Sequence, residues 1–167
     1  TGGLASGKSF IAHVLEDAGC HVVHADQLGH EVLQPGAEAY AAVVAEFGHG
    51  ILNEDGLIDR RRLAALVFDH PDRLAVLNNL VHPAVFERQD QLLRTLDQQD
   101  PNGIVVVEAA IMYETGSHTR YQKMIVAVCS EEQQIQRAMK RDHADRESVL
   151  ARLRRQLPLA EKASRAD

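Results

Sequence analysis

Hydrophobic residues follow helical spacing in some parts of the chain and form short continuous runs in others. Helical spacing covers Phe10 to Ala18 and Glu131 to about Arg141. A short β-prone run extends from Cys20 to Ala25. Continuous apolar runs, typical of strands buried on both faces, extend from Ile104 to Glu108 and from Met124 to Val128. Helices that alternate with apolar strands in this way predict an α/β fold, with a parallel sheet covered by helices on both faces.

A block of helical patterns separates the run that ends at Ala25 from the run that begins at Ile104. It is too long for a single crossover, so we predict an inserted helical lobe over about residues 27–97. A helix boundary is expected at His82-Pro83, because the residue before a proline is pushed out of the helical region and proline suits the first turn of the next helix. The predicted helices of the lobe are Gln27 to Leu33, Ala37 to Phe47, Arg60 to Phe68, Asp72 to Leu80, and one from Pro83 to about Leu96.

The whole chain, residues 1–167, is therefore predicted to be one domain with three parts. The core covers about residues 1–26 and 103–130, and the helical lobe lies between these two stretches. Residues 131–167 form a lid and C-terminal helices, among them a basic helix from Asp145 to Gln156.

The chain opens with Gly2-Gly3-Leu4-Ala5-Ser6-Gly7-Lys8-Ser9, two glycines five positions apart followed by Lys and Ser. In this pattern, successive backbone N–H groups enclose a phosphate at a helix N-terminus. Lys8 would neutralise the β- and γ-phosphates, and the Ser9 hydroxyl would bind Mg²⁺. The alternative is a glycine-rich turn that caps an ordinary helix. A strand is expected before such a loop, so we expect the sequence to be trimmed at this end.

Two acidic residues follow predicted strands, at the sheet edge where ligands gather in parallel α/β folds. Asp26 would face the phosphate site or would cap the next helix, and its position alone does not decide between these roles. Glu108 ends the Val-rich strand, where phosphate-loop proteins keep an acid that contacts Mg²⁺. The alternative for Glu108 is an ordinary acid at a strand end.

The net charge of -6 argues against nucleic acid or an anionic membrane as the main partner. Of the 18 Lys and Arg residues, however, nine lie between Arg137 and Arg165, beside four acids. This basic segment could form a lid that neutralises the charge of phosphates. The usual explanation for such a run of charges, however, is a face exposed to solvent. The candidate side chains are Arg137, Lys140, Arg141, Arg152, Arg154 and Arg155.

Other features favour a small kinase in the cytoplasm. The sequence has no Asn-Lys-x-Asp motif, which argues against a switch GTPase, and no apolar stretch long enough to cross a bilayer. Cys20 and Cys129 lie far apart in the sequence, which is typical of free thiols in a reducing compartment. The sequence does not indicate an oligomeric state.

The ordered set of motifs resembles the dephospho-coenzyme A kinase family over almost the whole chain. Residues 1–9 are similar to its phosphate loop, and His24-Ala25-Asp26 is similar to its Asp-Ala-Asp segment. Val105 to Glu114 resembles its Val-Val-Leu-Asp strand and the following loop. Further similar positions are Pro35-Gly36, Phe47-Gly48, Asp55-Gly56, Leu57 to Arg60, Val67-Phe68, His82-Pro83, Gln136-Arg137, Arg141-Asp142, Arg152, Gln156, Lys162 and Ala166-Asp167.

The resemblance implies that ATP and dephospho-coenzyme A are the substrates and that Mg²⁺ is required. It implies that Gly2, Gly3 and residues Ala5 to Phe10, with Leu4 between them, hold ATP. Asp26 would accept or orient the proton of the ribose 3′-hydroxyl. Arg137 and Arg141 would steady the transferring phosphoryl group, with Arg152 as a helper.

The sequence departs from the family pattern at several positions. His24 replaces the first Asp of the Asp-Ala-Asp segment, Glu108 replaces an Asp, Ala109-Ala110 replaces a Pro-containing turn, and Phe10 replaces a hydroxyl residue. The chain also stops at Asp167, before the last strand expected of the family. Two alternatives remain, a kinase of another small molecule or nucleotide, and an ATP-binding protein without catalysis.

Overall fold

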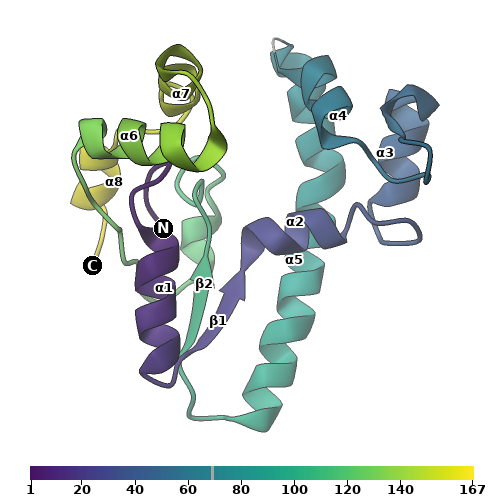
Figure 1. Ribbon diagram of the computed structural model, residues 1–167. Coiled ribbons are helices and arrows are strands. Elements are labelled where there is room, and N and C mark those ends of the chain that lie inside the picture. The colour runs from purple at the N-terminus through teal and green to yellow at the C-terminus, as the bar shows by residue number, and fades with distance from the viewer. Residues whose placement is uncertain (69) are drawn as a thin grey trace. The chain divides into compact units, whose positions relative to one another are not determined.

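The computed structural model describes residues 1–68 and 70–167. It divides into two compact units, one of residues 1–23 and 104–167 and one of residues 24–103 (Figure 1). Among the described residues, no helix is both long and apolar enough to span a membrane.

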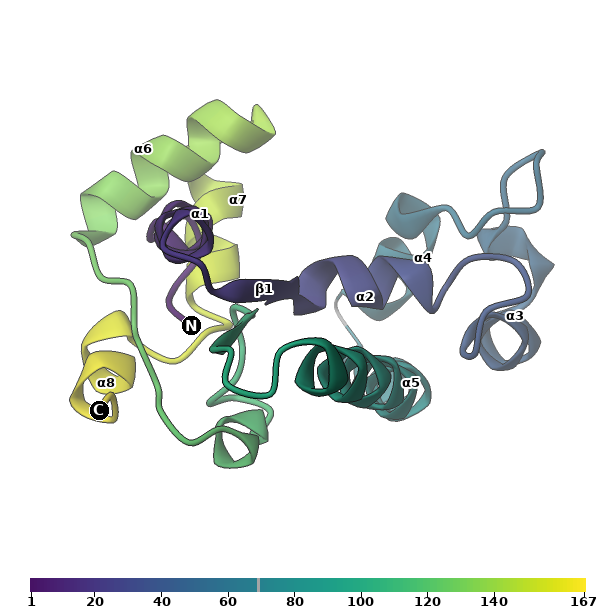
Figure 2. The same ribbon diagram turned by 90° about the horizontal axis from the view of Figure 1, so that it is seen from below.

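The first unit is built on two strands, β1 (His21–His24) and β2 (Val105–Glu108), which pair side by side. The amide of His21 donates a 2.9 Å hydrogen bond to the Ile104 carbonyl where the pairing begins. Helix α1 (Lys8–Asp17) lies on one side of the strands and α8 (Leu159–Ser164) on the other (Figure 2). The predicted α/β class with a parallel sheet and helices on both faces is confirmed.

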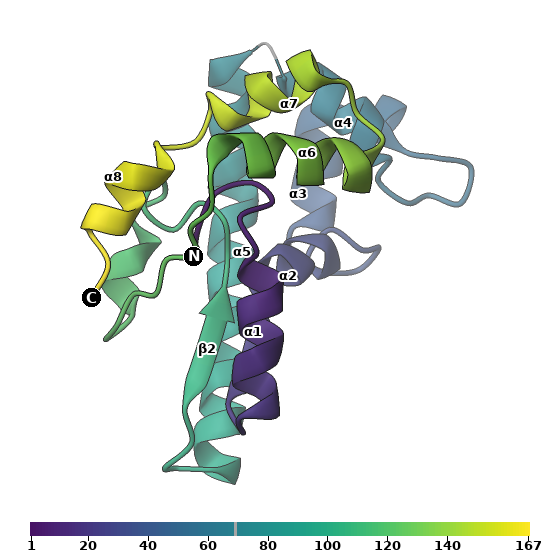
Figure 3. The same cartoon turned by 60° about the vertical axis from the view of Figure 1, so that its left-hand side comes forward.

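Local sequence explains where the helices of this unit begin. Ser130 and Gln133 form a capping box at the start of α6 (Glu131–Asp142), and the Asp145 carboxylate accepts from the Ser148 amide at the start of α7 (Arg146–Leu153). Figures 1 and 3 both place α6 and α7 beyond the N-terminal end of α1. Leu4 packs in that space against a buried apolar cluster formed by Ile135, Ala138 and Val149. The first turn of the chain is thus held between α1 and α6.

Three predictions for this unit need correction. The run from Met124 to Val128, predicted as a strand, contributes only an isolated parallel bridge between Ala127 and Gly2. The two strands are mostly half-buried, with only Val23 fully buried, because few neighbours cover so small a sheet. The basic helix is shorter than predicted and ends at Leu153. The short helix η2 (Ser117–Arg120) was not predicted, and α8 lies among the C-terminal helices predicted for residues 131–167, although its bounds were not given.

After the end of β1, the described residues of the second unit form helices joined by loops, with one isolated antiparallel bridge between Leu52 and Ile58. Its elements are α2 (Ala25–Glu31), α3 (Tyr40–Phe47), η1 (His49–Ile51), α4 (Arg60–Val67) and α5 (Pro71–Gln99). Helices α2, α3 and α4 all pack against α5. Their shared apolar core is formed by Val32, Ala39, Val43, Phe47, Ile51, Leu63, Val67 and Ala84.

The predicted helix boundary at His82-Pro83 is wrong, because α5 runs through it as one helix of 29 residues with Pro83 inside. Proline lacks the amide that would bond the Asn79 carbonyl, and in a helix interior it costs about 3 kcal/mol or more. Packing of three other helices along α5 offsets this cost. Tertiary contacts therefore decide the length of α5 against its local sequence.

Candidate functional site

Residues 1–7 form the turn that leads into α1. The Thr1 hydroxyl donates a 2.7 Å hydrogen bond to the Ala109 carbonyl, and the Ala127 amide donates to the Thr1 carbonyl at 2.9 Å. Gly7, at the N-cap of α1, has φ of 103°, a backbone conformation that residues with a Cβ rarely adopt. Ala5 is also left-handed, with φ of 52°. The turn therefore has the special backbone conformations expected of a phosphate loop.

Two polar side chains of this loop are arranged for an anion. The Ser6 hydroxyl oxygen is buried and has no hydrogen-bond partner within the described part of the chain. The Lys8 ammonium donates a 2.9 Å hydrogen bond to the Gly3 carbonyl, across the mouth of the loop. A buried hydroxyl without a partner is costly, so a bound anion that accepts from Ser6 would stabilise the site. The N-terminus of α1 adds a favourable dipole.

The two residues predicted to bind a metal lie together. The hydroxyl of Ser9, in the first turn of α1, donates a 2.9 Å hydrogen bond to the carboxylate of Glu108 at the end of β2. Both supply hard oxygen ligands, which Mg²⁺ prefers, and Mg²⁺ commonly uses one or two protein oxygens together with substrate phosphates. Elsewhere in residues 1–68 and 70–167, no group of three or more His, Cys, Asp or Glu could hold a metal ion. The chemistry of this pair thus fits a phosphate-bound Mg²⁺.

A cavity of about 650 Å³ opens beside the loop. This volume lies within the range of about 300 to 1,000 Å³ that is usual for small-molecule sites. The loop contributes Ser6 and Gly7, and α1 contributes Phe10. The other lining residues are Ile11, Ala127, Val128, Cys129, Gln133 and Arg137. An apolar cavity that reaches the phosphate loop could hold the base and sugar of a nucleotide.

Sequence analysis missed Val128, Cys129 and Gln133 as cavity residues. Val128 and Cys129 end an apolar run, and Gln133 belongs to the capping box of α6. Each residue therefore has a role in secondary structure, and nothing in its local sequence indicates a cavity. The only available signal was the rule that ligands gather at the carboxyl ends of strands.

The three candidate arginines have different surroundings. Arg137 lines the cavity, and its guanidinium lies 3.9 Å from the position that a Cβ on Gly7 would take. Arg141 and Arg152, in contrast, both donate to the carboxylate of Asp142. The hydrogen bond from Arg141 and the neighbouring Arg152 lower the pKa of Asp142 from 3.8 to about 2. The structure brings Arg137 to the loop and binds Arg141 and Arg152 to an acid.

Asp26 is the second residue of α2 and is exposed. The N-cap of α2 is His24, which makes no side-chain capping bond, so the alternative that Asp26 caps this helix is wrong. Asp26 follows β1 by two positions, but it belongs to the second compact unit. Its approach to the phosphate loop therefore stays a prediction.

Comparison with known proteins gives consistent results. The family model described as Dephospho-CoA kinase matches residues 1–167. A dephospho-CoA kinase of Halalkalibacterium halodurans is 38% identical over 171 residues, which cover 100% of this chain and 83% of that protein. A dephospho-CoA kinase of Carboxydothermus hydrogenoformans is 36% identical, with 100% of this chain and 81% of that protein covered.

Solved structures agree with the sequence comparisons. The crystal structure of TT1252 from Thermus thermophilus matches with a TM-score of 0.84 and 33% identity, over 99% of this chain and 82% of that chain. A dephospho-CoA kinase from Campylobacter jejuni matches with a TM-score of 0.69 and 28% identity, again over 99% of this chain and 82% of that chain.

Proposed function

The chain belongs to the dephospho-CoA kinase family, and we propose that it transfers the γ-phosphoryl group of ATP to the ribose 3′-hydroxyl of dephospho-CoA. The product is coenzyme A. The observation that carries this proposal is the phosphate loop with a nucleotide-sized cavity beside it, which Ser6, Gly7, Phe10 and Arg137 line.

The loop is proposed to bind the phosphates of ATP. Backbone N–H groups between Gly2 and Ser9 would donate to phosphate oxygens, as they do in phosphate loops generally. The Ser6 hydroxyl, which lacks a partner within the described residues, would gain one. Lys8 would exchange its bond to the Gly3 carbonyl for bonds to the β- and γ-phosphates. The base and ribose of ATP would occupy the cavity between Phe10 and Arg137.

Ser9 and Glu108 are proposed to hold Mg²⁺. The Ser9 hydroxyl and the Glu108 carboxylate already lie 2.9 Å apart. When bound, the metal neutralises charge on the phosphate oxygens during transfer. A Glu in place of Asp at this position keeps the same ligand chemistry with one more methylene of reach.

Asp26 and the arginines are proposed to act on the acceptor and on the transferring group. The 3′-oxygen forms a bond to the γ-phosphorus, the bond from that phosphorus to the β,γ-bridging oxygen breaks, and ADP leaves. The hydroxyl proton passes to the carboxylate of Asp26. Arg137 is proposed to stabilise the charge on the phosphoryl oxygens, with Arg141 and Arg152 released from Asp142 to assist it.

The decisive experiment combines purified protein, ATP, Mg²⁺ and dephospho-CoA, with the product identified by mass. We expect coenzyme A and ADP in equal amounts. Parallel reactions with adenosine, AMP and pantothenate as acceptors separate this function from that of another small-molecule kinase. Phosphorylation of one of these acceptors in preference to dephospho-CoA would reject the proposed substrate.

A second measurement separates catalysis from simple ATP binding. Calorimetry gives the affinity for ATP in the absence of an acceptor, and the same sample is then assayed for transfer. Tight binding without transfer to any acceptor would indicate a non-catalytic ATP-binding protein. The cytoplasmic location expected from the sequence stays a prediction.

A further inference from the structure

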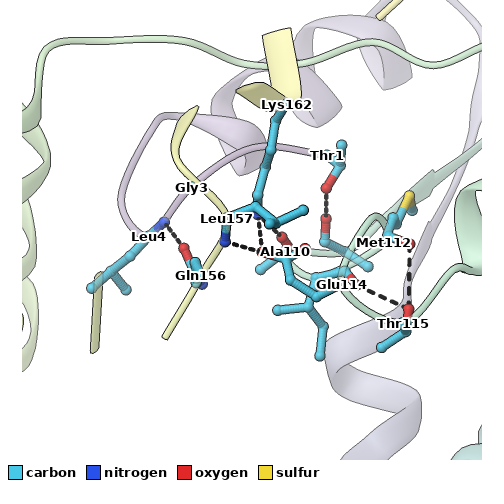
Figure 4. Close-up of polar contacts among 12 residues, drawn as sticks. Thr1, Gly3, Leu4, Ala110, Met112, Glu114, Thr115, Gln156, Leu157 and Lys162 are labelled. Atoms are coloured by element: carbon cyan, nitrogen blue, oxygen red, sulfur yellow. Dashed lines mark hydrogen bonds and ion pairs between the residues drawn. The ribbon is translucent and has the colours of Figure 1, made fainter. Parts of the chain in front are cut away.

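Leu4, in the middle of the phosphate loop, has both of its backbone polar groups bonded to glutamine side chains. Its amide donates a 2.8 Å hydrogen bond to Oε1 of Gln156, as Figure 4 shows. Its carbonyl accepts a 2.8 Å hydrogen bond from Nε2 of Gln134 on α6. The two glutamines lie 152 and 130 positions away in sequence. Side chains from two distant parts of the chain thus form hydrogen bonds with one peptide segment of the loop.

We propose that Gln134 and Gln156 are positioning residues that fix the conformation of the loop for phosphate binding. The inference rests on the proposed function, because it concerns the loop that is proposed to bind ATP. Leu4 precedes Ala5, whose left-handed conformation costs about 1 kcal/mol or more for a residue with a Cβ. Bonds that hold Leu4 on both sides oppose relaxation of Ala5 and keep the following amides directed into the loop.

Burial and close packing support a specific role for Gln134. Its side chain is 4% exposed, which is unusual for a glutamine unless its amide is satisfied. A Cβ on Gly3 would lie 2.2 Å from Nε2 of Gln134, so any other residue at this position would displace the amide of Gln134. The Leu4 side chain packs against Ile135 and Ala138 on the same helix. Helix α6 therefore holds the loop by packing and by a hydrogen bond.

The residue that follows Gln156 is held by a buried ion pair. The amide of this residue, Leu157, donates a 2.9 Å hydrogen bond to Oε1 of Glu114 (Figure 4). The same oxygen lies 2.6 Å from Nζ of Lys162, which is 0% exposed and also donates to the Ala110 carbonyl at 2.9 Å. Because both charges are paired and bonded to the backbone, the segment that carries Gln156 has little freedom to move.

The chemistry of the two contacts fixes how each amide group is used. A backbone N–H can only donate, so Gln156 must present its oxygen to Leu4, and a carbonyl can only accept, so Gln134 must present its NH₂ group. Glutamate keeps an acceptor but loses the donor. Gln156→Glu should therefore preserve the contact, whereas Gln134→Glu should break it and set a negative charge against a carbonyl beside the phosphates.

The test compares Gln134→Glu, Gln134→Met, Gln156→Glu and Gln156→Met by calorimetry with ATP, by steady-state kinetics and by thermal unfolding. We expect both Gln134 variants and Gln156→Met to bind ATP about tenfold more weakly, as loss of a buried hydrogen bond implies. Gln156→Glu should bind within about threefold of the parent protein. The KM for dephospho-CoA should not change in any variant. Gln136→Ala, an exposed position on the same helix, is the matched control.

Several outcomes would overturn the inference. Unchanged ATP affinity in both Gln134 variants would show that the loop keeps its conformation without this bond. An equal loss of ATP affinity in Gln156→Glu and Gln156→Met would show that the hydrogen bond accepted by Oε1 of Gln156 does not position the loop. A rise in the KM for both substrates together, in step with a lower Tm, would indicate a general structural role. Because ATP affinity is measured without an acceptor, the inference is tested even if dephospho-CoA proves not to be the substrate.

Discussion

The hydroxyl of Ser9 donates a 2.9 Å hydrogen bond to the carboxylate of Glu108, although the two residues lie 99 positions apart. Ser9 belongs to the first turn of α1, and Glu108 is the last residue of β2. Contacts between α1 and β2 bring both oxygens to the end of the phosphate loop. The two residues proposed to hold Mg²⁺ thus come from a local motif and from a distant strand.

If this pair holds Mg²⁺, Glu108→Gln should raise the Mg²⁺ concentration needed for half-maximal rate by about tenfold, because one anionic ligand becomes neutral. ATP affinity measured in EDTA should not change. The measurement is a Mg²⁺ titration of the initial rate at saturating ATP. Glu147→Gln, at an exposed position on α7, serves as the control and should behave as the parent protein. An unaltered Mg²⁺ requirement in Glu108→Gln would place the metal elsewhere.

Asp26→Asn should lower kcat by about a hundredfold or more while leaving ATP affinity unchanged, because only the group that accepts the proton is lost. The change keeps the size of the side chain in the first turn of α2. Single-turnover kinetics and calorimetry on the same preparation separate the two effects. Asp97→Asn, on an exposed turn of α5, is the control. Full activity of Asp26→Asn would show that another group handles the proton.

Much of the fold follows from local patterns, and the exceptions have physical causes. The helix predicted from Glu131 to about Arg141 is confirmed as α6, and the capping box at Ser130 explains where it begins. The helix boundary at Pro83 is wrong because packing along α5 outweighs the local cost of proline. A strand is not fixed by its own sequence, since it needs a partner, and Met124 to Val128 forms a single bridge.

The candidate site shows the same division. The loop before α1 is contiguous in sequence, so the turn and its left-handed Gly7 follow from the local motif, whereas its binding of phosphate stays a prediction. The cavity and the bonds that hold Leu4 combine segments more than 100 positions apart, and no spacing rule relates Leu4 to Gln156. The sequence places Asp26 after a strand. It does not distinguish an acid that caps the next helix from one that takes part in the reaction, because both occur at this position.

Asp142 should make the stability of the protein depend on pH in the acidic range. Its pKa falls from 3.8 to about 2 through the hydrogen bond from Arg141 and the neighbouring Arg152. A carboxylate with a depressed pKa stabilises the folded state above its unfolded pKa, and this contribution is lost as pH falls through the folded value. Asp142→Asn should therefore be less stable by about 1 kcal/mol at pH 7.

The difference between the parent protein and Asp142→Asn should shrink as the pH falls from about 4 toward 2. Urea unfolding at pH 7, 5, 4 and 3 measures it, because urea does not screen the ion pairs as a salt would. Arg146→Gln, which breaks a separate exposed pair with Glu132, is a control for general loss of surface charge. A difference that stays constant over this range would mean that Asp142 gains no stability from its arginines.

Pro83→Ala should raise the free energy of unfolding by about 1 kcal/mol, because it restores an amide inside α5 that can bond the preceding turn. Pro83 is exposed, so the smaller side chain leaves no buried cavity. Pro101→Ala, in the loop after α5, is the matched control and should be neutral or slightly destabilising, since it frees the unfolded chain. Urea unfolding gives both values. A less stable Pro83→Ala would show that proline at this position does not destabilise α5.

The buried pair of Glu114 and Lys162 yields the last prediction. Lys162→Met should reduce the free energy of unfolding by about 3 kcal/mol or more, because it leaves the Glu114 carboxylate in the interior without its cation. Lys162 is 0% and Glu114 17% exposed, so water cannot replace the lost partner. Adding Glu114→Gln to Lys162→Met should recover part of this loss, since the uncompensated charge disappears while an oxygen remains for the Leu157 amide.

A double-mutant cycle with Lys162→Met and Glu114→Gln measures the interaction. We expect the double variant to be more stable than the sum of the single losses implies, by about 2 kcal/mol. Lys123→Met, which removes an exposed pair with Asp167, provides the comparison and should cost less than about 1 kcal/mol. Additive losses would mean that the two charges are stabilised independently. In that case the segment carrying Gln156 would depend on the backbone bonds of Ala110 and Leu157 rather than on the ion pair.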